Sequence, residues 1–158
     1  MKNSKLSSGS FFNFTILEKE PTYTLGKNER LKSRKAIDQL FTGGKSFSLF
    51  PFKVIYVKAP ANEQQSTSGE FLKAAFSVSK RYFKKAVYRN RIKRLMREAY
   101  RLQKPALQNQ LEQNKRVLTI FILYVSNELP EYELVVSKMN ALLKRLRKIV
   151  NEETIPNT

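Results

Sequence analysis

The sequence predicts an α/β fold in which one long helix connects two strands of the same sheet. Residues 71–79 alternate in the manner of a strand, and one face carries Leu72, Ala74, Phe76 and Val78. A helical pattern follows from about Lys85 to Gln103. The run from Val117 to Val125 is almost entirely apolar, as expected of a central strand covered on both faces. This order of strand, helix and strand indicates a βαβ unit.

A shorter helix and a further strand precede this unit. Ser33 is a suitable N-cap for a helix that reaches Phe41, and Gly43-Gly44 stops it. Its apolar residues recur at helical spacing: Ala36, Ile37, Leu40 and Phe41. From Phe50 to Val57 the pattern is that of a strand, with Phe52, Val54 and Tyr56 on one face. Pro60 ends this strand.

The remaining segments complete the expected chain. Residues 60–70 are polar with Pro and Gly at the edges, and they predict a flexible hairpin loop between the two strands. From Glu131 to Val150 an amphipathic helix is expected, with a core side formed by Val135, Met139, Leu142, Leu146 and Ile149. Cations in its last turns suit the helix dipole.

One domain, residues 29–150, is predicted. Its length is typical of a single core, and 41% apolar residues are enough to form one. Residues 1–28 are rich in Ser, Asn, Thr and Lys without a sustained period, so they are expected to be a disordered tail. Residues 151–158 are expected to form a second, short disordered tail.

Charge indicates the kind of partner. The chain has 30 Lys and Arg against 13 Asp and Glu, a net charge of +17, and a polyanion would relieve the resulting self-repulsion. Nucleic acid is the leading candidate. An anionic membrane competes with it, but the sequence has no run of about 18 apolar residues, and no membrane partner is expected.

Residue types that are missing restrict the chemistry. The chain contains no Cys and no His, which excludes thiol nucleophiles, imidazole acid-base catalysis, disulfides and the usual zinc ligands. No catalytic side chain is therefore assigned, and metal ligands stay unassigned. The N-terminal stretch lacks the features of a signal peptide, so a cytoplasmic location is expected.

The long helix is strongly divided into two sides. At about 100° per residue, a core side is predicted for Ile92, Leu95, Met96, Ala99 and Leu102. The opposite side collects Arg89, Asn90, Lys93, Arg94, Arg97 and Arg101, with Arg91 at its flank. Like charges at these spacings repel each other until phosphates neutralise them. This arrangement favours polyanion binding over a merely solvated face.

A longer motif surrounds this helix. Phe76 to Arg81 (FSVSKR) is followed, after a short connection, by Arg89 to Glu98 (RNRIKRLMRE). The combination resembles the signature of the bacterial ribonuclease P protein family. Arg30-Leu31-Lys32, Leu40-Phe41 and Gly44-Lys45 support the resemblance, which covers about residues 30–150.

The resemblance implies a particular fold. Members of this family are α/β (α+β) two-layer sandwiches similar to domain 2 of ribosomal protein S5, with a mixed sheet. Their crossover through the basic helix is left-handed, whereas about 98% of βαβ units are right-handed. The left-handed crossover is thus an expectation from the family and not from the pattern.

The resemblance also implies site residues. In this family the basic helix lies against the catalytic RNA, which maps RNA contacts onto Arg89, Asn90, Arg91, Lys93, Arg94 and Arg97, with Lys80 and Arg81 as supporting cations. A cleft between the first helix and the sheet holds the single-stranded leader of precursor tRNA. The matching positions are Ile37, Phe41, Val54, Tyr56 and Ser77.

Two departures from the family pattern affect these assignments. Ile37 stands where an aromatic residue is common. One extra residue lies between Lys80 and Arg89, which affects how Lys84 and Lys85 are directed.

The function implied is that of the protein subunit of ribonuclease P. It would bind ribonuclease P RNA and precursor tRNA, while Mg²⁺ held mainly by the RNA activates the water that hydrolyses one phosphodiester bond. A general or ribosome-associated RNA-binding protein is the main alternative, and it would need the basic helix but no leader cleft. A DNA-binding helix-turn-helix protein would need a helix just before the basic one, where a strand pattern stands instead. DNA is therefore not an expected partner.

Overall fold

A four-stranded mixed sheet forms the centre of the computed structural model, which describes residues 25–64 and 70–152. The strands lie in the order β1-β2-β4-β3. Their bounds are β1 Lys45–Leu49, β2 Phe52–Pro60, β3 Leu72–Val78 and β4 Arg116–Tyr124. β3 and β4 are parallel, and the other neighbours are antiparallel. The predicted mixed sheet and βαβ unit are confirmed, and β4 is central, as its apolar run predicted.

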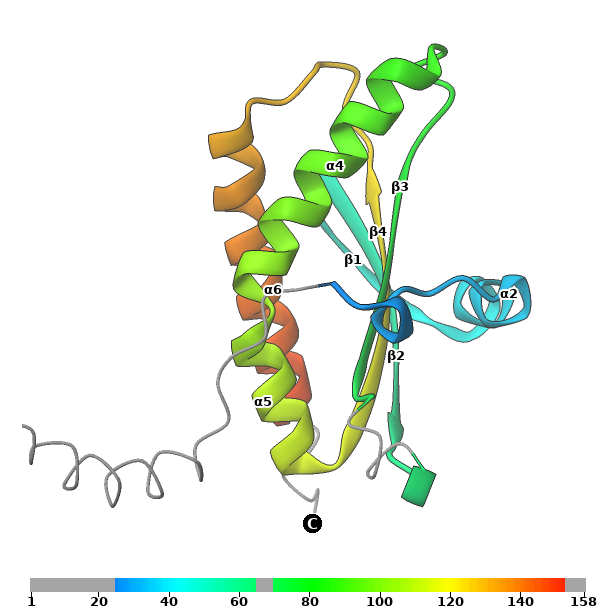
Figure 1. The fold of residues 1–158 in the computed structure, drawn as a ribbon, viewed down its shortest axis with the longest axis vertical. Coiled ribbons are helices and arrows are strands. Elements are labelled where there is room, and N and C mark those ends of the chain that lie inside the picture. The colour runs from blue at the N-terminus through cyan, green and yellow to red at the C-terminus, as the bar shows by residue number, and fades with distance from the viewer. Residues whose placement is uncertain (1–24, 65–69, 153–158) are drawn as a thin grey trace, which may run out of the picture.

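Helices cover the two faces of this sheet unequally (Figure 1). One face carries α4 (Ala86–Gln103), α5 (Pro105–Asn114) and α6 (Tyr132–Glu152), and the other carries the shorter α2 (Arg34–Gly43). Ser33 caps α2, as predicted, because its hydroxyl accepts a hydrogen bond from the Ala36 amide at 3.3 Å. A 3-10 turn, η1 (Lys27–Glu29), precedes α2.

The apolar side chains form two clusters, one on each face of the sheet. The larger cluster lies under α4, α5 and α6 and includes Phe52, Ile92, Leu118 and Met139. The smaller cluster lies under α2 and is centred on Leu31, Leu40 and Ile55. Because α2 is short, part of the sheet face beside it is only half-buried, as at Phe121 and Leu123.

Two elements were not predicted. Strand β1 buries only Phe47 and has Ser46 and Ser48 exposed, so its edge position leaves almost no apolar signal. Helix α5 also has a weak pattern, since it buries only Leu107 and Leu111. Its Pro105 lies in the first turn, where proline is favourable because that amide needs no partner within the helix.

The expected hairpin between residues 60 and 70 is wrong. β2 and β3 do not pair, because β4 lies between them and hydrogen-bonds to both. Residues 60–70 therefore connect two strands that are not neighbours. Two strand patterns that follow each other in the sequence cannot show that a third strand, formed about 40 residues later in the chain, will separate them.

The folded part begins earlier and ends later than predicted. Glu29 in η1 accepts hydrogen bonds from Lys104, which is fully buried, and from Gln108 at 2.6 Å. Leu25 packs against the larger cluster, and α6 continues to Glu152. The other residues of the two predicted tails, 1–24 and 153–158, lie outside the described residues, as do residues 65–69 of the loop.

Helix α4 is rotated relative to the predicted core side. Ile92, Met96 and Ala99 are buried as expected, but Leu102 is exposed and Tyr100 takes its place in the core. The Tyr100 ring packs edge-on against Phe76 of β3, with ring centroids 5.2 Å apart. The helix thus directs Tyr100 toward β3, and Leu95 is only partly buried.

In the part of the chain that the structure describes, no helix has the length and apolarity needed to cross a membrane.

Candidate nucleic-acid interface

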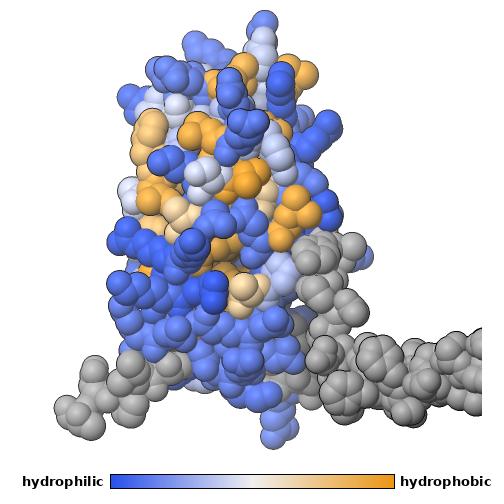
Figure 2. All heavy atoms as spheres, turned by 90° about the vertical axis from the view of Figure 1, so that its left-hand side faces the viewer, coloured by the Kyte–Doolittle hydropathy of each residue, from blue (hydrophilic) through white to orange (hydrophobic). Residues whose placement is uncertain are grey.

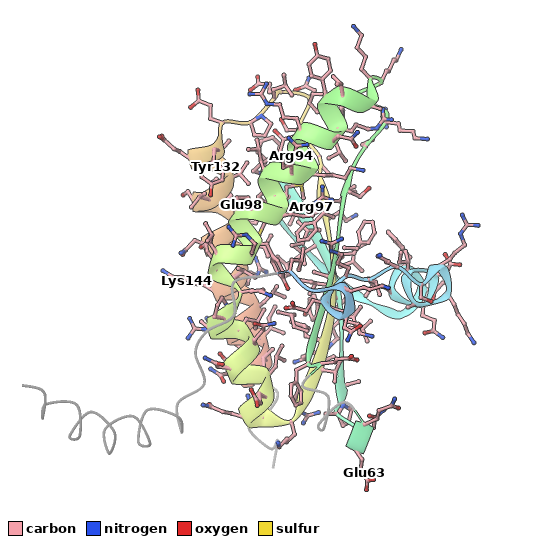
Figure 3. The ribbon with its side chains drawn as sticks, in the orientation of Figure 1. Glu63, Arg94, Arg97, Glu98, Tyr132 and Lys144 are labelled. Atoms are coloured by element: carbon pink, nitrogen blue, oxygen red, sulfur yellow. The ribbon has the colours of Figure 1, made fainter. Side chains whose placement is uncertain are left out.

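The outer side of α4 carries the predicted cationic stripe. Asn90, Arg91, Arg94 and Arg97 are exposed, while Arg89, Lys93 and Arg101 are half-buried. Figure 3 shows Arg94 and Arg97 on this helix beside Glu98. Lys80 and Arg81 are exposed in the turn that follows β3. The predicted core and cationic sides therefore remain separate despite the rotation of the helix.

The N-terminal end of α4 adds positive potential. Its first turn contains no acidic residue, and its N-cap residue, Lys85, makes no side-chain capping bond. Amide groups at a helix N-terminus are partial positive charges that attract phosphate. Lys84 and Lys85 stand next to them in the sequence and are exposed. This end of the helix combines the dipoles of its backbone amides with two exposed cations.

Arg89 has a structural role. Its guanidinium donates hydrogen bonds to the carbonyl oxygens of Phe83 and Lys84, both at 2.7 Å. These bonds hold the connection between β3 and α4 against the first turns of the helix. Arg89 thus positions the connection, and its availability to phosphate is lower than that of the exposed Arg91.

A hollow of about 290 Å³ lies beside the stripe. Four arginines and one acid line it together with Leu25: Arg30, Arg94, Arg97, Arg101 and Glu98. Arg101 pairs with Glu98 at 2.6 Å, and this bond holds the pKa of the Glu98 carboxyl below its usual value. Arg30 comes from the segment before α2, and helical periodicity within α4 could not bring it into the site. The lining carries a clear excess of positive charge.

A second surface lies between α2 and the sheet. Phe41 of α2 is 52% exposed, and its ring packs edge-on against Phe121 of β4 at a centroid distance of 5.0 Å. Ile37 packs against the same small cluster as Phe121. Along the sheet, Phe121 pairs with Ile55 on one side and with Ala75 on the other. This is a half-open face with aromatic edges.

The five residues predicted for a leader cleft do not come together. Val54 and Tyr56 lie in the larger cluster, under α6, while Ile37 and Phe41 lie on the opposite face of the sheet. Since successive residues of a strand point to opposite faces, a shift of one position exchanges the two faces. The residues of β2 that face α2 are Ile55 and Val57.

Ser77 is placed differently from Val54 and Tyr56. It follows Ala75 by two positions on β3, so it shares the face on which α2 lies. In the next row of the sheet, Ser77 pairs with Leu123, and Leu123 pairs with Lys53. Lys53 is exposed, which places a cation at the edge of this face. Sequence reasoning missed Lys53 and Phe121, because the pattern within a strand does not show which face of the sheet α2 will cover.

Protein ligands for a metal were not found in the described ranges. No group of three or more acidic residues comes close enough there to hold an ion. The acids instead make contacts with the protein itself, as Glu29 does with Lys104 and Glu98 with Arg101.

A cationic helix on one face of the sheet and a half-open aromatic surface on the other define this chain as a small basic α/β protein suited to binding a nucleic-acid strand. The family model described as Ribonuclease P matches residues 25–147. The chain belongs to the ribonuclease P protein family, whose members are RNA-binding components of an endoribonuclease complex active in tRNA 5′ processing.

Curated relatives and solved structures agree with this assignment. The chain is 38% identical to the ribonuclease P protein component of Porphyromonas gingivalis over 87% of its own length and 96% of the relative's. It is 33% identical to that of Chlorobium phaeobacteroides, covering 78% and 88%. The ribonuclease P protein of Thermotoga maritima, 24% identical, matches with a TM-score of 0.56 over 74% of this chain and 96% of that one. This last similarity supports the fold.

Proposed function

We propose that this protein assists the catalytic RNA of ribonuclease P in removing the 5′ leader from precursor tRNA, in the cytoplasm. The observation that carries the proposal is the pairing of two surfaces: the cationic side of α4 and the half-open face between α2 and the sheet. The first suits the phosphates of a folded RNA, and the second suits an extended strand.

The cationic side would hold RNA by its backbone. Each phosphate that a Lys or Arg neutralises releases condensed counterions, which makes binding strong at low salt and independent of sequence. Arg91, Arg94 and Arg97 are the best placed, because all three are exposed on one side of α4. Asn90, Lys93 and Arg101 would extend the contact, and Lys80, Arg81 and the loop-holding Arg89 would support it.

The face beside α2 would hold the leader. Unpaired bases stack on aromatic side chains whatever their sequence, while nearby cations follow the backbone. Phe41 offers an exposed ring, Phe121 supports its edge, and Lys53 supplies a charge. Ile37 and Ser77 belong to this surface, and the positions assigned to Val54 and Tyr56 are taken by Ile55 and Val57.

The protein's contribution would be selective binding rather than bond breaking. A contact made with the leader is available in the precursor and lost in the mature product, so it favours the substrate. The dispersed acids do not suggest a metal site on the protein, and Mg²⁺ bound by RNA phosphates would activate the water. No step of the chemistry is assigned to a side chain.

The test is cleavage of 5′-labelled precursor tRNA by a bacterial ribonuclease P RNA at low magnesium. Accurate cleavage is expected when the protein is added, and the RNA alone should be nearly inactive. The variant with Arg91, Arg94 and Arg97 all changed to Gln should lose most of this rescue. Tight RNA binding without any rescue would instead indicate a general RNA-binding protein.

A further inference from the structure

A second basic surface lies at the β1 edge of the sheet, away from the connection between β3 and α4. A hollow of about 560 Å³ separates β1 from the last turns of α6. It is lined by three cations and one acid of α6 and by one aromatic residue each from β1 and β2: Lys144, Arg145, Lys148, Glu152, Phe47 and Tyr56. Figure 3 shows Lys144 on α6 and Arg94 and Arg97 on the neighbouring α4.

The cations of this hollow carry uncompensated charge. Lys144, Arg145 and Lys148 are exposed, and across the described ranges none of them forms an ion pair within 4.0 Å. Glu152 is the single acid of the lining. Figure 2 shows hydrophilic side chains over α5 and the second half of α6, in the lower part of that view. Three cations so close together repel each other, and a polyanion removes that cost.

The helix dipole alone does not account for this cluster. Cations near a helix C-terminus are favourable at any position around its axis. The last turn of α6, however, contains no basic residue. Arg147 lies as near to that end as its neighbours but on a different side of α6, where its Nε donates to Gln110 of α5 at 3.3 Å. Lys144, Arg145 and Lys148 instead gather on the side that meets β1.

The floor of the hollow is rigid and fixes one cation. The Arg145 guanidinium lies over the Phe47 ring, 4.4 Å from its centroid, and the Tyr56 ring is 6.0 Å from that of Phe47. Both aromatic rings are more than 90% buried, so they cannot stack with bases. Lys58 also fixes the end of α6, because its Nζ donates to the Ile149 carbonyl at 3.0 Å. The surface can therefore recognise phosphates but not base identity.

Its position separates it from the α4 stripe. Four strands spaced by about 4.8 Å put β1 about 14 Å from β3, and α4 packs over β3 while the end of α6 packs over β1 and β2. A single phosphate cannot reach both surfaces, so each surface would hold different phosphates of the RNA.

We infer that Lys144, Arg145 and Lys148 bind a second phosphodiester backbone segment of the RNA partner, independently of its sequence. The identity of that RNA rests on the proposed function, but the existence of the site does not. The protein would thereby connect two separate RNA segments across the width of its sheet.

The experiment measures binding of the full chain to a bacterial ribonuclease P RNA as KCl is varied. The triple variant Lys144→Gln, Arg145→Gln, Lys148→Gln is expected to reduce the salt slope of log Kd by about 2. Gln preserves helix propensity, and circular dichroism checks that the variant folds. An unchanged slope in a folded variant overturns the site.

A matched pair tests whether position matters as well as net charge. Arg145→Gln and Arg147→Gln remove the same charge from the same helix. The first is expected to reduce the slope by about 0.8, and the second should leave it unchanged. Equal reductions would overturn the inference in favour of a diffuse effect of net charge.

The α4 variant separates this inference from the proposed function. Changing Arg91, Arg94 and Arg97 to Gln should remove most of the rescue of cleavage. It should also reduce the salt slope by a further amount that adds to the effect of the α6 variant. If cleavage survives in the α4 variant while the α6 variant still loses slope, the role proposed for α4 fails and the second site stands.

Discussion

Tyr100 of α4 combines complete burial with a polar atom. Within the described residues its hydroxyl oxygen has no hydrogen-bond partner. Burial, and then the negative charge of Glu29, raise the pKa of Tyr100 well above its usual value. The ring itself is useful, because it fills the space between α4 and Phe76. The hydroxyl is a cost that the packing of the ring outweighs.

Tyr100→Phe is therefore expected to stabilise the protein by about 1 kcal/mol at neutral pH, because it removes an unsatisfied polar group and keeps the ring. The pKa of Tyr100 is raised in the folded state, so below about pH 10 the ionisation of Tyr100 does not affect the free energy of unfolding. Above about pH 10 Tyr100 loses its proton in the unfolded chain but keeps it in the folded one, so the free energy of unfolding falls. Tyr100→Phe has no proton to lose at this position. Between pH 8 and pH 11 its free energy of unfolding should therefore fall less than that of the unsubstituted protein, by up to about 1.4 kcal/mol per pH unit above pH 10.

Urea unfolding at several pH values measures both effects. Tyr82→Phe is the control, since Tyr82 is an exposed tyrosine, and it should leave stability at pH 8 unchanged. A loss of stability in Tyr100→Phe would show that the hydroxyl has a favourable contact.

Phe41 is the residue on which leader binding should depend most. Its exposed ring is supported by Phe121, so Phe41→Ala should weaken binding of precursor tRNA by about 1 to 3 kcal/mol. Binding of mature tRNA should change little. Phe50→Ala is a matched control, because Phe50 is 68% exposed in the turn between β1 and β2, away from α2. Equal losses for both ligands would mean that Phe41 does not contact the leader.

At the scale of elements, the junction between α2 and β1 fixes where Phe41 stands. Gly44 donates its amide hydrogen to the Leu40 carbonyl at 2.9 Å. A Cβ at Gly44 would lie 2.4 Å from that same oxygen and 3.0 Å from Ile55. Gly43, one residue earlier, has open space around it. The two adjacent glycines therefore differ completely in their tolerance of a side chain.

Gly44→Ala should destabilise the protein by about 1 to 3 kcal/mol, because α2 must move to relieve the overlap. That movement should also reduce the preference for precursor over mature tRNA. Gly43→Ala should raise stability by roughly 0.5 kcal/mol, since alanine favours the helix. Thermal unfolding of the two variants provides the comparison, and a similar effect of both would contradict the close approach at Gly44.

Strong local patterns predicted most elements. Alternation in Leu72–Val78 and the apolar run of β4 define strands by themselves. The separation of cationic and apolar sides along α4 was also predicted, although the core side is rotated from the predicted one. β1 and α5 bury too few side chains to leave such a pattern. Their presence depends on neighbours that come from elsewhere in the chain.

Across the whole molecule, the cationic side of α4 was predictable because the helical period alone places its charged residues on one side. The cleft was not, because it depends on which face of β2 meets α2, and a shift of one residue along the strand decides that. Val54 and Tyr56 consequently lie under α6, and Ile55 and Val57 lie under α2. Contacts between distant segments, such as Arg30 beside Arg94, lie beyond any local pattern.

The bond between Glu29 and Lys104 also joins distant segments, since it ties the turn before α2 to the junction of α4 and α5. Lys104 is fully buried, and removing one partner of a buried ion pair is costly even though replacing both partners with apolar residues can be neutral. Evolution would therefore tend to change positions 29 and 104 together, and the two should covary among related sequences.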